Sequence, residues 1–176
     1  MKIHYKPLSR YFPKGHINEG EPTYFVEKIL NSIEIDFTTN KYVGLLNELN
    51  PNMKSQLADF LFDSGFNYKE YGLKHHTIRK GNKVKVGDFI QFYVWSGKPY
   101  HSKWIKPFPP IEVIKVWNFE KDLISDNWYL DGLEMSSAQR IDLAINDGLD
   151  YKDLLAWFKE PFSGQIICWN DSINYK

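Results

Sequence analysis

Hydrophobic residues in the N-terminal third of the chain recur at the spacing of amphipathic helices. Glu21 and Pro22 are predicted to open a helix, because proline is tolerated in the first turn of a helix. Its buried face would consist of Phe25, Val26, Ile29, Leu30 and Ile33. Two more helices are predicted over residues 42–49 and 51–62, the second with Asn50 as its N-cap.

The pattern then changes to the alternation of polar and apolar residues that is typical of β-strands. Strands are predicted over residues 76–79, 89–95, 111–117, 128–133 and 165–169, with a short strand or extended arm within residues 3–12. The longest strand would bury Ile90, Phe92 and Val94. The proline-broken aromatic segment 100–110 is too irregular for a sheet interior and is expected at the surface.

Two late helices are predicted between the last two strands. The first covers residues 137–145 with Ser136 or Ser137 as its N-cap, and the second covers residues 151–158 with Asp150 as its N-cap. Helices and strands together predict an α+β protein.

Composition limits the classes of protein that fit. A chain of 176 residues, 43% of them hydrophobic, is long enough for one full core, so we expect a single domain. The single cysteine, Cys168, excludes an internal disulfide, and the lack of a Cys/His cluster argues against structural zinc. No apolar run approaches the ~20 residues of a membrane span, and no apolar signal segment follows Met1. We therefore expect a cytoplasmic protein that does not bind membranes.

The formal charge of the chain is zero, so affinity for a polyanion would need a local basic patch. Residues 72–109 provide one, with Asp88 as the sole carboxylate among the cations Lys74, Arg79, Lys80, Lys83, Lys85, Lys98, Lys103 and Lys106. Acidic residues predominate over residues 120–153, so the two stretches could also neutralise each other across the fold.

Aromatic residues are interleaved with these cations. They are Phe89, Tyr93, Trp95, Tyr100 and Trp104. Aromatic faces beside cations suit stacked bases and phosphates, at ~1–3 kcal/mol per stacked base. The alternative interpretation is that the rings belong to the core and that the lysines form a solvated rim.

The basic strand and the glycine turn after it carry a recognisable pattern, Lys74-His75-His76-Thr77-Ile78-Arg79 followed by Val86-Gly87-Asp88 and an apolar strand. This pattern resembles the ASCH domain of the PUA-like group. The resemblance covers about residue 25 to the last strand, with residues 36–71 as a helical insertion. It implies that the whole chain is one ASCH-like domain. The domain would be a small mixed or antiparallel β-barrel flanked by helices, with a cleft beside the motif that binds RNA or nucleotides.

The resemblance also implies a candidate catalytic set. One bacterial branch of the ASCH family hydrolyses acetylcytidine with a lysine, a threonine three residues later and a glutamate ahead of the late helix. Lys74 and Thr77 match the first two in type and spacing, and Asp147 stands at the third position. Thr77 would be the nucleophile, Lys74 the base and Asp147 the orienting carboxylate. A lysine can act as the base only if burial or a second cation lowers its pKa.

Three functions remain open at this stage. The first is a module for RNA, single-stranded nucleic acid, nucleosides or nucleotides, whose binding residues would be Lys74, His76, Thr77, Arg79, Lys80, Trp95, Lys98, Tyr100, Lys103 and Trp104. The second is the amidohydrolase, and the third is a protein-interaction module that docks a partner through residues 100–110.

Each candidate residue also has an ordinary structural interpretation. Thr77 suits any strand, Lys74 any exposed turn, and Arg79 a salt bridge at the edge of the core, while Asp147 and Gly148 could simply end a helix. His75 and His76 are adjacent in a strand, so they would point to opposite faces and would not share a metal ion. We predict no metal and no cofactor, and the pattern leaves the oligomeric state open.

Overall fold

A computed structural model describes residues 1–33, 71–122, 125 and 127–175 of the chain. The helices predicted over residues 42–49 and 51–62, and nearly all of the predicted insertion, lie outside the described residues. In the part that is described, no helix is both long enough and apolar enough to cross a membrane.

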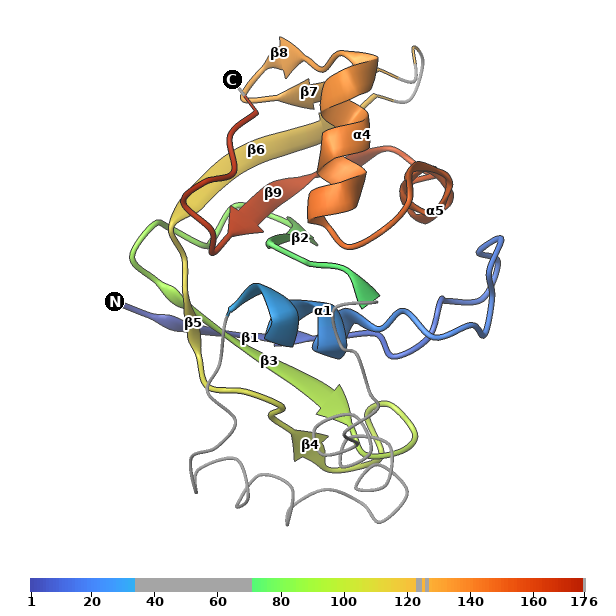
Figure 1. Cartoon of the computed structure of the whole chain (residues 1–176), viewed down its shortest axis with the longest axis vertical. Coiled ribbons are helices and arrows are strands. Elements are labelled where there is room, and N and C mark those ends of the chain that lie inside the picture. Colours follow the sequence, from blue (N-terminus) through green and yellow to red (C-terminus); the bar gives the residue numbers. More distant parts are fainter. Residues whose placement is uncertain (34–70, 123–124, 126, 176) are drawn as a thin grey trace.

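The described strands form two sheets (Figure 1). In the smaller sheet, β1 (Ile3–Pro7) runs parallel to β3 (Phe89–Trp95), and β3 also pairs antiparallel with β4 (Trp104–Ile105) and β5 (Ile111–Glu112). The alternation in β3 is as predicted, because Ile90, Phe92 and Val94 are all buried.

The larger sheet has the order β2-β9-β6-β7-β8 and is antiparallel throughout. Its strands are β2 (His76–Lys80), β9 (Phe162–Cys168), β6 (Lys115–Lys121), β7 (Trp128–Leu130) and β8 (Leu133–Glu134). The last strand of the chain therefore lies between β2 and β6. This places the basic strand β2 at one edge of the sheet.

Three helices are described, and the N-caps of the two late ones are as predicted. The first helix begins later than predicted, because Pro22 pairs with Tyr11 in an isolated β-bridge and lies outside the helix. Helix α1 (Phe25–Ser32) buries the predicted apolar face. Helix α4 (Ser137–Asn146) begins with a capping box between Ser136 and Gln139. Helix α5 (Tyr151–Trp157) begins at Asp150, whose carboxylate accepts a hydrogen bond from the amide of Asp153.

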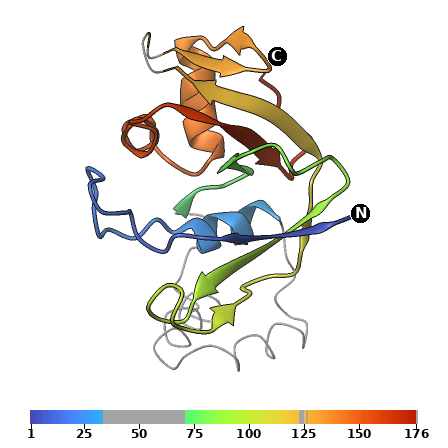
Figure 2. The same cartoon turned by 180° about the vertical axis from the view of Figure 1, so that it is seen from behind.

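The helices cover the sheets and close one continuous core. Both views show α4 lying across β6 and β9 (Figures 1 and 2). Helix α1 lies near β2 at the junction of the two sheets (Figure 1), where Oγ of Ser32 accepts a hydrogen bond from the indole of Trp169. Apolar side chains from both sheets and all three helices belong to this core. The described part of the chain therefore folds around one apolar interior.

The structure confirms the α+β class and corrects some details. The predicted surface segment 100–110 contains strand β4, and it buries Ile105 and Phe108 in the core. The first half of the segment is exposed and the second half turns inward, so its aromatic composition reflects packing as well as exposure. The predicted strand 111–117 is two strands, β5 and β6, each in a different sheet. The described strands do not close into a single barrel.

Gly164 allows strand β2 to lie close to β9, and replacing it tests this pairing. A Cβ atom at Gly164 would lie 2.2 Å from the carbonyl oxygen of Arg79, which is backbone and cannot move aside. We expect Gly164→Ala to lower the free energy of unfolding by about 3 kcal/mol, the upper end for overpacking. Urea denaturation measures this change. The neighbouring exposed variant Ser163→Ala should stay within about 0.5 kcal/mol of the wild type. Equal stability of the two variants would contradict the close approach.

Candidate functional site

The segment before β2 is held by backbone hydrogen bonds to two helices. The amide of Lys74 donates to the carbonyl of Lys28 in α1 at 3.2 Å, and the amide of His75 donates to the carbonyl of Asn146 at the end of α4 at 2.8 Å. Residues far apart in the sequence therefore meet at the start of the basic motif.

Lys74 and Asp147 form a buried ion pair at this meeting point. The ammonium of Lys74 lies 2.7 Å from Oδ1 of Asp147 and donates to the carbonyl oxygen of the same residue at 2.5 Å. The two residues are only 1% and 6% exposed. The ring of Phe25 lies 4.2 Å from the ammonium and adds a cation–π contact. The structure thus brings together two of the three predicted catalytic residues.

The end of helix α4 places Asp147 against the lysine. Asp147 is the C-cap of α4, and Gly148 after it has φ +73°, a left-handed conformation that glycine adopts without strain. A Cβ atom at Gly148 would lie 3.1 Å from Cβ of Lys74, so the absence of a side chain also leaves room for the lysine. The Asp147–Gly148 pair therefore ends a helix and forms the ion pair at the same time.

A second chain of polar contacts leads away from Asp147 through His76. Nδ1 of His76 lies 3.3 Å from Oδ1 of Asp147, at an angle that does not make a hydrogen bond. Nε2 of His76 lies 2.6 Å from the hydroxyl of Tyr175, and this hydroxyl accepts a hydrogen bond from Nδ2 of Asn146 at 3.1 Å. Tyr175 was missed by the sequence analysis, because no local pattern connects it to a residue in β2 so distant in the chain.

Burial and charge act in opposite directions on these groups. Burial lowers the pKa of Lys74 to about 8, although the carboxylate of Asp147 opposes the shift. Burial raises the pKa of Asp147, but the charge of Lys74 and the contact with His76 outweigh it, and the net shift is downward. The pKa of His76 is lowered by burial, so its imidazole is neutral near pH 7. The pair is therefore ionised at pH 7, with a lysine close to releasing its proton.

Thr77 and Arg79 are placed differently. Thr77 is 3% exposed, and among the described residues its hydroxyl makes no hydrogen bond to Lys74 or Asp147. The guanidinium of Arg79 donates from Nη2 to the carbonyl of Pro7 at 2.8 Å, and its Nε is buried without a partner among the described residues. Arg79 therefore connects β2 with β1 and keeps one donor unused.

The predicted aromatic binding residues, Trp95, Tyr100 and Trp104, gather at the carboxyl end of β3. Five rings meet there, and we call them the aromatic surface: Tyr5, Tyr93, Trp95, Tyr100 and Trp104. The rings of Tyr93 and Trp104 are stacked, with centroids 4.3 Å apart and planes at 13°. Tyr100 is 85% exposed and Trp104 is 44% exposed. The rings therefore serve both roles considered for them: Tyr93 is buried in the core, and Tyr100 and Trp104 are exposed and able to stack on a ligand.

Lysines lie in the same segments as the rings of the aromatic surface. Exposed Lys98 and Lys103 lie in the segments that join β3 to β4, and the ammonium of Lys106 is 5.6 Å from the ring centroid of Tyr5. Pro7, which accepts from Arg79, pairs directly with Tyr93 in the sheet. Arg79 is therefore the residue that links the basic motif to the aromatic surface.

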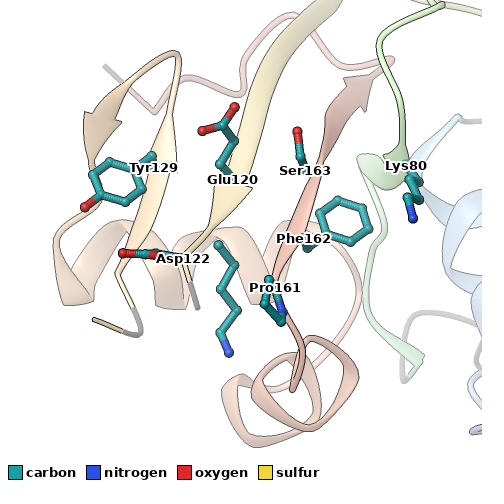
Figure 3. A pocket seen from close by; sticks show the side chains of 8 residues that line it. Lys80, Glu120, Asp122, Tyr129, Pro161, Phe162 and Ser163 are labelled. Carbon is teal, nitrogen blue, oxygen red and sulfur yellow. The ribbon is translucent and has the colours of Figure 1, made fainter. Parts of the chain in front are cut away.

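Two cavities open beside the exposed Lys80. One, of about 520 Å³, is lined by residues 13–16, 78–80 and 156–162. The other, of about 630 Å³, is lined by Lys80, Glu120, Lys121, Asp122, Tyr129, Pro161, Phe162 and Ser163. Figure 3 shows the ring of Phe162 on the Lys80 side of this second cavity, with Glu120, Asp122 and Tyr129 on the other. Lys80 thus faces open cavities, whereas Lys74, His76 and Thr77 are interior residues.

No cluster of three or more His, Cys, Asp or Glu side chains suited to a metal ion occurs in the described ranges. No family model, no curated protein and no solved structure matches the chain. The ASCH resemblance therefore depends on the motif residues alone and stays a prediction.

The lowered pKa of Lys74 makes stability depend on pH. Between about pH 8 and 10.5 the unfolded chain holds the proton of this lysine while the folded chain releases it. The free energy of unfolding should therefore rise with pH across this window in the wild type relative to Lys74→Met. Urea denaturation at a series of pH values measures the difference. The exposed lysine variant Lys85→Met controls for the loss of one positive charge. Parallel profiles of wild type and Lys74→Met would contradict the assignment.

Proposed function

We propose that this protein is an ASCH-like module that binds single-stranded nucleic acid, RNA in particular, through the aromatic surface and the cations around it. The single observation that carries the proposal is the stacked pair Tyr93 and Trp104 with the exposed ring of Tyr100 beside it. Bases stack on such rings at ~1–3 kcal/mol each, whatever their sequence.

The charges around the rings support the same ligand. Phosphate groups follow the bases of a strand, and Lys98, Lys103 and Lys106 are exposed beside the rings. No acidic residue occurs between Asp88 and Glu112 in the sequence, so this part of the chain carries only positive charge. Binding should therefore weaken as salt rises.

The fold agrees with this proposal at a coarse level. An α+β arrangement with a basic strand after the first helix is compatible with an ASCH-like, PUA-like domain, and we propose that the two sheets correspond to its barrel. In this proposal the ion pair of Lys74 and Asp147 is part of the scaffold. It fixes the start of β2, and thereby holds Arg79 next to Pro7.

A second candidate function is favoured by one observation, the burial of Lys74 at 2.7 Å from the carboxylate of Asp147, where burial lowers the pKa of the lysine to about 8. A lysine with that pKa is suited to act as a general base near neutral pH. With Thr77 as nucleophile and Asp147 as the orienting group, the site would hydrolyse an acylated nucleoside such as acetylcytidine. The interior position of the three residues favours the binding function over this one.

Removing the Trp104 ring tests the binding function. Titration of labelled oligouridylate, followed by fluorescence anisotropy, should give an affinity lower by roughly 5- to 150-fold for Trp104→Ala, the equivalent of one stacked base. The matched control is Tyr11→Ala, which removes an exposed ring outside the aromatic surface and should leave affinity unchanged. Equal affinities of wild type and Trp104→Ala, or no binding by the wild type, would reject the proposal.

Incubation with acetylcytidine distinguishes the enzyme from the binding module. If the second function holds, cytidine appears by chromatography with the wild type and is lost in Thr77→Ala. Thr77→Val controls for the packing of the buried side chain, because it keeps the shape and removes the hydroxyl. Turnover that survives in both variants, or no turnover by the wild type, removes this candidate.

A further inference from the structure

The cavity of about 520 Å³ has a basic lining that the sequence analysis did not anticipate. Its positive side chains come from three separate parts of the chain: Lys14, Arg79, Lys80 and Lys159. Glu160 is the sole carboxylate in its lining. None of the four cations forms an ion pair within the described residues. The cavity is therefore positively charged, and an anion is the ligand that fits it.

Arg79 lines this cavity and has one donor that the described fold leaves unused. Its Nη2 is occupied by the carbonyl of Pro7, but its Nε is buried and has no partner among the described residues. A buried N–H without a partner lowers stability, and an anionic oxygen that reaches it would supply the missing hydrogen bond. The rings of Trp157 and Phe162 form apolar parts of the lining.

The same arginine connects the cavity to the aromatic surface. Arg79 holds Pro7, and Pro7 lies opposite Tyr93, the inner ring of the stacked pair. Helix α5 and the loop after β1, which border the cavity, lie on the side of the molecule toward which β3 runs (Figure 1). In Figure 2 the same elements again lie together on one side.

We propose that this cavity binds the phosphate backbone of the strand whose bases stack on the aromatic surface, an inference that rests on the proposed function. On this proposal the strand passes from Trp104 to Arg79, and then to Lys14 and Lys159, which line the same cavity as Arg79. Lys159 donates to the carbonyl of Gly15, which holds the Lys14 loop against the end of α5. The two outer cations thus belong to one positioned unit.

Negative charges beyond Phe162 limit how far the bound phosphate backbone extends. The neighbouring cavity shares Lys80, Pro161 and Phe162 with the first one, but Glu120 and Asp122 line it on the far side (Figure 3). Carboxylates repel phosphate, so the backbone stops at Phe162. The bound strand is accordingly longer than the aromatic surface alone requires, and it does not extend over β6.

Oligouridylates of two lengths test the inference in the double variant Lys14→Ala/Lys159→Ala. The two probes are about four and about twelve nucleotides long, within the ~4–16 nucleotides that single-strand binding folds occupy. The shorter probe reaches the aromatic surface, and its affinity should stay unchanged. The longer probe should bind more weakly, and the slope of log K against log salt should become less steep by about 1.4, since each lost phosphate contact contributes ~0.7.

Matched controls separate this inference from the proposed function. Lys85→Ala/Lys152→Ala removes two exposed positive charges outside the cavity and should leave the salt slope as in the wild type. Lys159→Arg keeps the charge and should keep the affinity for the longer probe. If the double variant binds both probes like the wild type, or loses both equally, the inference is overturned while the proposed function stands. If the wild type binds neither probe, the proposed function fails and the inference fails with it.

Discussion

The buried ion pair between Lys74 and Asp147 is the constraint on which the arrangement of this protein depends. Both charges are removed from water, and each has the other as its compensation at 2.7 Å. Breaking such a pair by removing one partner costs about 3–5 kcal/mol, because the other charge is then left buried and alone. The pair therefore ties the start of β2 to the end of α4.

Several features of the surface follow from that connection. Once the start of β2 is fixed, its pairing with β9 places Arg79 against Pro7 of the other sheet. Arg79 then lies between the aromatic surface and the basic cavity, with one donor still unused. The interior residues of the motif fix the position of β2. In the proposed function, residues further along this strand and next to it contact the ligand. This division explains why Lys74 and His76, although in the basic motif, are almost fully buried.

Local signals in the sequence were sufficient for much of the fold. The apolar spacing of α1, the alternation in β3 and the N-caps of α4 and α5 depend on neighbours within a few residues, and the structure confirms each of them. The contact between Lys74 and Asp147 was suggested only by the ASCH resemblance. No local pattern predicts the parallel pairing of β1 with β3, because the two strands are brought together by the packing of the whole core.

The same reasoning explains what was missed in the site. Tyr175 reaches His76 from near the end of the described chain, and Lys14 and Lys159 reach one cavity from opposite ends of the sequence. The aromatic segment was misjudged for another reason: Ile105 and Phe108 turn inward while Tyr100 stays exposed, which prolines and irregular spacing do not reveal. The positions of charges and rings in the sequence therefore identified the segment that forms the surface, but not which of its residues are buried.

Ultraviolet cross-linking of the protein to oligouridylate, with mass spectrometry of the cross-linked peptides, tests the central claim most directly. The account predicts that the cross-links fall on Tyr100 and Trp104, the exposed rings of the aromatic surface. Cross-links confined to β8 or the exposed face of α4, with none on these two rings, would contradict it.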